Sequence, residues 1–340
     1  MKRGSAGLKK PLSGYCLTDV ASCRHFFRCL DTDGIMRDGV GGVTLASGAA
    51  LSTGGNLLIT YDSDLMSLSN NMTNGVNPVA VGGAWATFGD GKAILAIYCG
   101  RVTTPADVRF AMGDVNGTMG GPAYGIGLPG NTAPHIAVKG PNGTNKYVQS
   151  GLSISSLNGG GGYTPGLTAA HAPGTNGTGV LMAAPTLSGG VITAVPFIHA
   201  GYDFILGTDP VKNGTIDLSQ VGVPPATYTV SAGLAAGLGS YHVGKDVMIL
   251  AKYTPGDPTY LSAFDAENGT EYFRCTTESG TTAFDVGAFT PDAYLRWSGL
   301  SLYGAAVFEF DAIPADWWPA ALWMAGAWKN GDKYLWPGWA

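Results

Sequence analysis

Tryptophan is concentrated at the C-terminal end of this chain of 340 residues, where six of its eight tryptophans lie in the last 24 positions. Each indole carries a large apolar area, and exposing so many of them to water within one short segment is unfavourable. We therefore expect the C-terminal segment to pack against a core or against a partner.

One helix is predicted inside this segment. Asp316 can cap its first turn, Pro319 falls where a missing N–H does no harm, and Asn330-Gly331 ends it. The spacing of four apolar residues predicts a single buried stripe, formed by Trp317, Ala321, Met324 and Trp328. Trp318 and Trp323 lie off this stripe, so we expect them, with Trp336 and Trp339, to contact a neighbouring loop or subunit.

The rest of the chain has the composition of a β protein. Only 13% of its residues are charged, whereas it contains 53 glycines and 20 prolines, which suits short strands joined by turns. The unbroken apolar run 92–99 predicts a strand that is covered on both faces. Residues 300–310 alternate between apolar and other positions, which predicts a strand with one buried face.

The chain divides by composition into an arm and a body. Residues 1–24 are basic and lack periodicity, whereas residues 25–340 carry the strand patterns. Within the body, residues 113–240 are rich in Gly and Pro, and we interpret them as loops and minor strands inserted into the β scaffold. A second small β domain in this range is the alternative interpretation.

Charge is distributed unevenly along the sequence. The net charge of −5 gives no general attraction to nucleic acid or to anionic lipid, yet seven of the nineteen basic residues lie in the first 37 positions. The arm is either solvated or docked on an acidic protein surface, and in the second case its contact residues are Lys2, Arg3, Lys9 and Lys10. We expect no membrane span and no secretory signal, because long apolar runs are missing from the sequence.

The ionisable residues do not form a recognisable catalytic or metal-binding motif. Glu267 and Glu271 are the nearest pair among four glutamates, and we expect them to flank a hairpin at Asn268-Gly269. The five histidines are scattered, and the five cysteines lack the spacing of a zinc site, so we interpret the latter as reduced thiols. We therefore expect no enzyme activity and no cofactor, although the loops 31–34 and 114–117 have the Asp and Asn residues that calcium would use. Both are equally good turn formers.

Four aromatic residues are candidates for stacking against sugar rings if the protein binds carbohydrate. Each is of a kind that is more often a core or rim residue than a ligand platform. They are Tyr163, Tyr202, Tyr241 and Trp297.

Short motifs near the two ends of the chain carry a resemblance to a known family. They are Arg37-Asp38-Gly39-Val40-Gly41-Gly42, Ala305-Ala306-Val307-Phe308-Glu309-Phe310 and an ending of the form Gly-x-Lys-x-Leu-x-Pro-x-Trp. With the order of predicted strands, they resemble minor virion proteins of tailed bacteriophages that carry a concanavalin A-like or laminin G-like jelly roll. The resemblance covers residues 25–112 and 245–339.

This resemblance implies an antiparallel β-sandwich in which the first and last strands pair in one sheet. It also implies a non-enzymatic structural protein of a phage particle, made in the host cytoplasm and attached to other virion proteins as a capsid decoration, collar or tail-fibre component. A homo-oligomer is expected, trimeric if the protein is fibre-like. The alternatives are a carbohydrate-binding receptor or adhesion module and, least favoured because glutamate is scarce, a polysaccharide-degrading enzyme.

Overall fold

Antiparallel strands make up most of the structure, and one α-helix is present among the residues it describes. The computed structural model describes residues 22–28, 35–38, 44–46, 59–62, 67–70, 92–104, 109–114, 124–128, 135–140, 143–148, 150–171, 178–202, 216–234, 238–254, 260–276 and 294–329. The helix, α1 (Trp317–Lys329), lies after the last strand. The predicted all-β class with a short C-terminal helix is confirmed.

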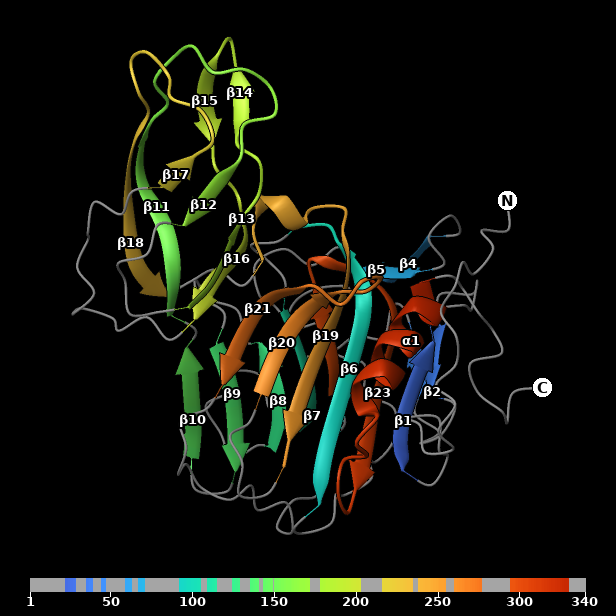
Figure 1. The fold of residues 1–340 in the computed structure, drawn as a ribbon. Helices are drawn as coiled ribbons and strands as arrows, with labels where there is room; N and C mark the ends of the chain where they lie inside the picture. The colour runs from blue at the N-terminus through green and yellow to red at the C-terminus, as the bar shows by residue number, and fades with distance from the viewer. Residues whose placement is uncertain are drawn as a thin grey trace.

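A ten-stranded sheet forms the centre of the molecule (Figure 1). The main path of this sheet runs β21 (Glu271–Thr276), β20 (Tyr260–Asp265), β19 (Asp246–Tyr253), β6 (Ala93–Val102), β23 (Leu300–Phe310), β1 (Cys23–Arg28), β2 (Ile35–Asp38) and β3 (Thr44–Ala46). Two short strands, β4 (Ile59–Asp62) and β5 (Ser67–Asn70), attach beside β23. The first described strand, β1, pairs antiparallel with the last, β23, and the pairing places Phe26 opposite Ala306.

The beginning of β1 lies inside the segment predicted as an arm. Cys23 and Arg24 belong to this strand, and the guanidinium of Arg24 donates to the buried carboxylate of Glu309 on β23 at 2.7 Å. Arg24 is therefore a residue of the sheet. Lys2, Arg3, Lys9 and Lys10 lie outside the described residues.

The two central strands are buried along their length. β6 is buried at every position except Arg101, which confirms a strand covered on both faces. All eleven residues of β23 are buried, so the prediction of a single buried face for this segment is wrong. The reason is that both faces of the large sheet are covered, because α1 packs on one face and a second, five-stranded sheet lies on the other.

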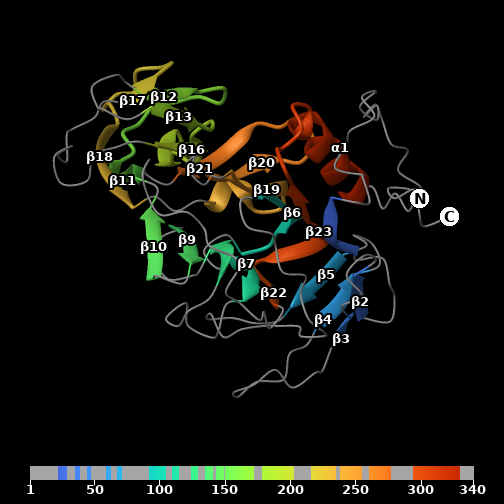
Figure 2. The ribbon, with the colours of Figure 1, turned by 90° about the horizontal axis from the view of Figure 1, so that it is seen from below.

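A five-stranded sheet lies on the side of the large sheet that faces away from α1 (Figure 2). Its order is β10 (Gly143–Val148), β9 (His135–Gly140), β8 (Tyr124–Leu128), β7 (Arg109–Asp114) and β22 (Tyr294–Ser298). Contacts of β9 and β10 with β21, and of β22 with β23, join the two sheets.

Helix α1 covers the opposite face of the large sheet above β6, β19 and β23. Its apolar stripe forms as predicted, since Ala321, Met324 and Trp328 are buried and Trp317 is partly buried against the same core. Further small residues on the helix, Ala320 and Ala325, are fully buried. Small side chains allow the helix to approach the sheet closely, and the indole of Trp328 then meets the ring of Phe26 at 5.6 Å between centroids.

Most of the segment 150–234 folds into four two-stranded sheets, which project beyond the two larger sheets (Figure 1). We call its described residues, 150–171, 178–202 and 216–234, the knob. The pairs are β11 (Ser150–Asn158) with β18 (Thr227–Leu234), β12 (Ala169–His171) with β17 (Ile216–Leu218), β13 (Thr178–Met182) with β16 (Phe197–Tyr202), and β14 (Thr186–Ser188) with β15 (Val191–Ala194).

The knob has an apolar cluster of its own around Tyr163, Leu167, Ile192 and Val195. The range 113–240, predicted to be loops and minor strands inserted into the scaffold, contains strands β8 to β18. That this range is an insertion into the scaffold, or alternatively a second small β domain, stays a prediction.

A glycine in β6 is expected to be essential for the central strand pair. A Cβ on Gly100 would lie 2.5 Å from the carbonyl oxygen of Ser301 on β23, so Gly100→Ala must push the two strands apart. We expect the free energy of unfolding in urea to fall by about 1–3 kcal/mol. Gly239→Ala is the control, because no atom lies within 4 Å of its added methyl group. Equal urea midpoints for the two variants would contradict this packing.

Candidate functional site

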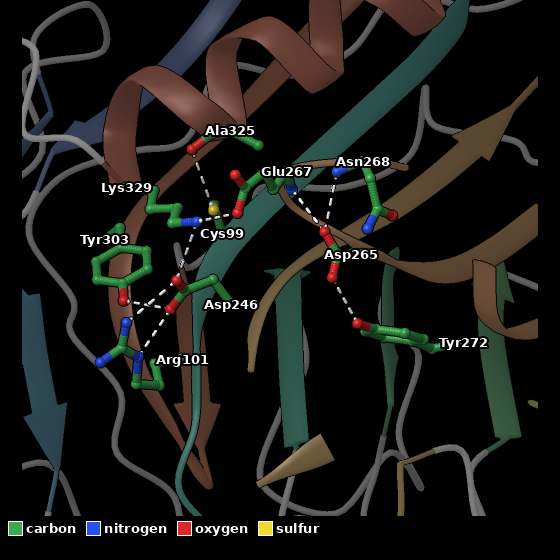
Figure 3. A network of polar contacts seen from close by, with 10 residues as sticks. All are labelled: Cys99, Arg101, Asp246, Asp265, Glu267, Asn268, Tyr272, Tyr303, Ala325 and Lys329. Carbon is green, nitrogen blue, oxygen red and sulfur yellow. Dashed lines mark hydrogen bonds and ion pairs between the residues drawn. The ribbon is translucent and has the colours of Figure 1, made fainter. Parts of the chain in front are cut away.

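A network of charged side chains joins the C-terminal end of α1 to the large sheet (Figure 3). Its centre is Asp246 on β19, whose carboxylate accepts from the Arg101 guanidinium at 2.8 and 3.1 Å. The Tyr303 hydroxyl donates to the same carboxylate at 2.6 Å, and the Lys329 ammonium lies 3.4 Å away. One partly buried carboxylate thus connects β6, β19, β23 and the helix.

The pKa of Asp246 shows that the network compensates its burial. Burial by itself would raise this pKa, but the hydrogen bonds from Arg101 and Tyr303 and the charges of Arg101 and Lys329 outweigh it, so the pKa lies below its usual value. Burial and the hydrogen bond to Asp246 raise the pKa of Tyr303 well above its usual value. At neutral pH the carboxylate is ionised and the phenol keeps its proton.

The hairpin between β20 and β21 forms the other half of this network. Lys329 donates to Glu267 at 3.0 Å, while Asp265 accepts from the backbone N–H groups of Glu267 and Asn268 at 2.9 Å each and from the Tyr272 hydroxyl at 2.6 Å. The prediction that Glu267 and Glu271 flank a hairpin is confirmed. The Asp265 carboxylate holds the turn through its backbone N–H groups, and the Glu267 carboxylate attaches the turn to Lys329 on the helix.

A second polar cluster lies where the knob meets β21, the edge strand of the large sheet. The Nδ1 atom of His199 on β16 accepts the N–H of Gly201 at 2.8 Å, so a proton is on Nε2. Nε2 lies 3.2 Å from Oε1 of Glu271, to which it donates. The carboxylate of Glu271 also accepts two hydrogen bonds from the Arg274 guanidinium, at 2.8 and 3.0 Å.

The pKa of Glu271, like that of Asp246, lies below its usual value. Burial alone would raise it, but the hydrogen bonds from His199 and Arg274 and the charge of Arg274 hold it below its usual value. An ionised carboxylate therefore connects the knob to the large sheet.

His242, in the short 3-10 helix Ser240–His242, completes this junction. Its Nδ1 accepts the N–H of Gly239 at 2.8 Å, and its Nε2–H donates to the carbonyl of Ile198 on β16 at 2.9 Å. The ring packs edge-on against Tyr272 at 4.6 Å. Burial lowers the pKa of His242 to about 4, and the charge of Lys245 acts in the same direction, so the ring is neutral at neutral pH.

Both clusters are suited to holding elements together. The partly buried carboxylates of Asp246 and Glu271 each face cationic or hydrogen-bonding partners that keep them ionised, and their contacts join elements that are distant in sequence. These contacts fix the helix and the knob on the sheet.

The predicted interface residues are partly within the described structure. Trp318 and Trp323 on α1 are partly buried against the core, and the Trp318 ring meets Phe264 at 4.5 Å between centroids. Trp318 thus packs on strand β20, and the predicted contacts of Trp318 and Trp323 with a neighbouring loop or subunit stay predictions. Trp336 and Trp339 lie outside the described residues, so their role as contacts stays a prediction.

The other candidate residues have varied positions. Tyr163 is a core residue of the knob, and its hydroxyl accepts the N–H of Ala226, so its ring is not a platform for sugars. Tyr241 packs on His242 and Tyr272, and Lys245 lies over its ring. The side chains of Tyr202 and Trp297 are outside the described part of the structure.

The candidate metal loops are only partly described. Asp114 ends β7, while residues 31–34 and 115–117 lie outside the described ranges. Within those ranges, no three His, Cys, Asp or Glu side chains form a group that could hold a metal ion. Cys23 and Cys99 are buried thiols, and the Cys99 thiol donates to the carbonyl of Ala325 at 3.4 Å. None of the described helices has the length and apolarity needed to cross a membrane.

Sequence reasoning missed the pairing of His199 with Glu271. The two residues are 72 positions apart, and they meet because β16 packs beside β21. No local spacing signals such a contact.

Comparison of the chain with models of protein families, with curated proteins and with solved structures finds no match.

Loss of the Asp246 carboxylate is expected to destabilise the fold strongly. Asp246→Ala leaves Arg101, Lys329 and the Tyr303 hydroxyl without their shared acceptor, so we expect urea unfolding to show a loss of about 2–4 kcal/mol. Glu267→Gln is the matched control, because Glu267 contacts the same lysine but its side chain is 77% exposed. We expect it to change stability by less than about 0.5 kcal/mol. A similar effect of both changes would show that Asp246 does not hold the network together.

Stability is expected to depend on His242 in mildly acidic solution. The unfolded chain takes up a proton on this residue near its ordinary pKa of 6.5, whereas the folded chain does so only near pH 4. Stability is therefore fully present above pH 6.5 and falls as the pH is lowered toward 4, by about 2 kcal/mol at about pH 5. Urea unfolding of the wild type and of His242→Gln across this range tests the assignment. The variant should lose this part of the pH dependence, and an identical slope in both proteins would rule out His242 as its source.

Proposed function

We propose that this protein is a non-enzymatic structural protein of a tailed-phage particle, attached to other virion proteins as a capsid decoration, collar or tail-fibre component. The resemblance at the two ends of the chain supports this proposal. Under this proposal the protein is made in the host cytoplasm and becomes part of the virion as a homo-oligomer, which is trimeric if the protein is fibre-like.

The finer fold is part of the same proposal. We infer that the ten-stranded and five-stranded sheets are the two layers of a β-sandwich of the concanavalin A-like jelly-roll type. Two observations support this inference: β1 pairs with β23, and the smaller sheet lies on the face of the large sheet away from α1.

The observation that carries the proposed attachment role is the partial exposure of three tryptophans on α1. Trp328 is buried and secures the helix, whereas Trp317, Trp318 and Trp323 are only partly buried. The helix is fixed at its last residue by Lys329, so these indoles have defined positions on its surface. Partly exposed aromatic side chains on a rigid element are typical of protein contact surfaces.

The contacts of the two partly buried carboxylates, Asp246 and Glu271, support a structural role over hydrolysis. A glycosidase needs two carboxyl groups that flank a substrate bond, one of them free to exchange a proton. Asp246 and Glu271 instead hold helix, knob and sheet together, and their basic partners keep both ionised.

Attachment is expected to need both the arm and the partly exposed indoles of α1. A deletion of residues 1–21 leaves β1 complete, because that strand begins at Cys23. We expect this deletion and Trp323→Ala each to lower the amount of the chain in purified particles by about tenfold or more, as loss of a contact worth one decade of affinity would do. Immunoblots of particles from producing cells measure the amount.

Pro319→Ala is the matched control for the indole, because Pro319 is exposed on the same helix. It should leave incorporation unchanged. Melting temperatures of the purified variants separate a loss of attachment from a loss of folding. Normal incorporation of both the deletion and Trp323→Ala would refute the proposed attachment surfaces.

A further inference from the structure

The knob is nearly free of charge. Asp217 is the one Asp, Glu, Lys or Arg among its described residues, although the whole chain has nineteen basic and twenty-four acidic residues. The charges of the described structure therefore lie almost entirely on the two larger sheets and the helix.

The knob also carries most of the exposed apolar side chains. Of the five large hydrophobic residues that are exposed in the described structure, Leu181, Val191, Val221 and Val223 lie on the knob, and Val243 does not. Val221 and Val223 are each 86% exposed. Valines this exposed gain much from contact with another apolar surface, because nearly all of their area is still in water.

Backbone hydrogen bonds hold the segments that present these valines. Val223 N–H donates to the carbonyl of Gly161 at 2.8 Å, and Gly161 N–H donates to that of Pro224 at 2.9 Å. On the other side of the glycine run, Ile192 N–H donates to the carbonyl of Gly159 at 3.0 Å. Residues 159–162 thus lie between the two valine-bearing segments and bond to both.

Gly222 shows how closely these segments pack. A Cβ at this position would lie 2.2 Å from the Gly161 carbonyl oxygen and 2.5 Å from the Tyr163 ring. The loop is therefore seated tightly on the knob, with Val221 and Val223 on either side of a buried glycine. We call Val191, Val221 and Val223 the valine patch. Because its backbone is already fixed, little conformational entropy is lost when it is covered.

We propose that the valine patch is a contact surface through which copies of this chain associate with one another. This inference rests on the proposed function and deepens it: that proposal includes a homo-oligomer and assigns attachment to other virion proteins to the arm and the tryptophans of α1, but it names no contact between copies. Each copy carries a net charge of −5, so two copies repel one another where their charged surfaces meet. The knob offers a described surface on which two copies can meet with almost no charged side chains between them.

A second copy fits the patch better than other partners do. A charged protein surface would lose hydration against a patch that has no charge to pair with it. A carbohydrate would favour an exposed aromatic ring, but Tyr163 beside the patch is buried, and the side-chain oxygen of Gln220 already accepts from Thr164. In a symmetric contact, the valines of one copy meet the same apolar patch on the other.

Sedimentation velocity of the full chain tests this inference. Over concentrations from about 1 to about 500 μM, we expect the wild type to associate, and Val221→Asp/Val223→Asp to weaken association by about tenfold or more. Val243→Asp is the matched control, because Val243 is 52% exposed but lies outside the knob. It should associate like the wild type. Association should persist from about 50 to about 500 mM salt, because screening does not weaken a contact made without charges.

Three outcomes would overturn the inference: a wild type that stays monomeric throughout, an Asp double variant that associates like the wild type, or association that is lost on deletion of residues 1–21. The substituted valines are exposed, so unchanged melting temperatures are expected and exclude misfolding as the cause. Association that survives the deletion while particle incorporation is lost would support both proposals separately. Normal association with normal incorporation of the deletion and of Trp323→Ala would refute the proposed attachment and leave the valine patch supported.

Discussion

The packing of α1 on β6 and β23 is the contact on which the architecture depends. Ala320, Ala321 and Ala325 are fully buried, so the helix backbone lies close enough to the sheet for the Cys99 thiol to reach the carbonyl of Ala325. The helix also reaches β1 through Trp328 and Phe26. Without this cover, one face of the two most apolar strands would be exposed to water, and such a loss of burial is large compared with the stability of a domain.

Charged side chains act where this apolar packing ends. Lys329, the last residue of the helix, bonds to Asp246 and Glu267, and its positive charge also suits the negative end of the helix dipole. Glu271 has the same role at the base of the knob, where it meets His199 and Arg274. A chain with few charges thus places several of them at the junctions between elements, where apolar contact alone would not define the relative positions.

The sequence predicted the elements better than it predicted their contacts. The run 92–99 and the stripe on α1 were predictable because their patterns report burial directly, and the hairpin at Asn268-Gly269 was predictable from its turn residues. The burial of both faces of β23 was not, because it depends on which strands lie beside it and on what covers the sheet. The pairing of His199 with Glu271 and the convergence of Arg101, Lys329 and Tyr303 on Asp246 depend in the same way on strand order, which local spacing does not encode. Six of the eight predicted interface residues lie outside the described structure, and the contacts of all eight with partners stay predictions.

The position of β23 between β6 and β1 has a consequence for how the chain reaches this state. The central strand of the large sheet is contributed by residues 300–310, and its neighbours come from residues 93–102 and 23–28. Until the last strand is in place, β1 and β6 have no common neighbour, and their exposed edges can pair with other molecules. Such long-range closure makes folding slow, since distant segments must meet before the central pairings form. The unfinished sheet is thus the species most prone to aggregation, and conditions that shorten its lifetime should increase the yield of native protein.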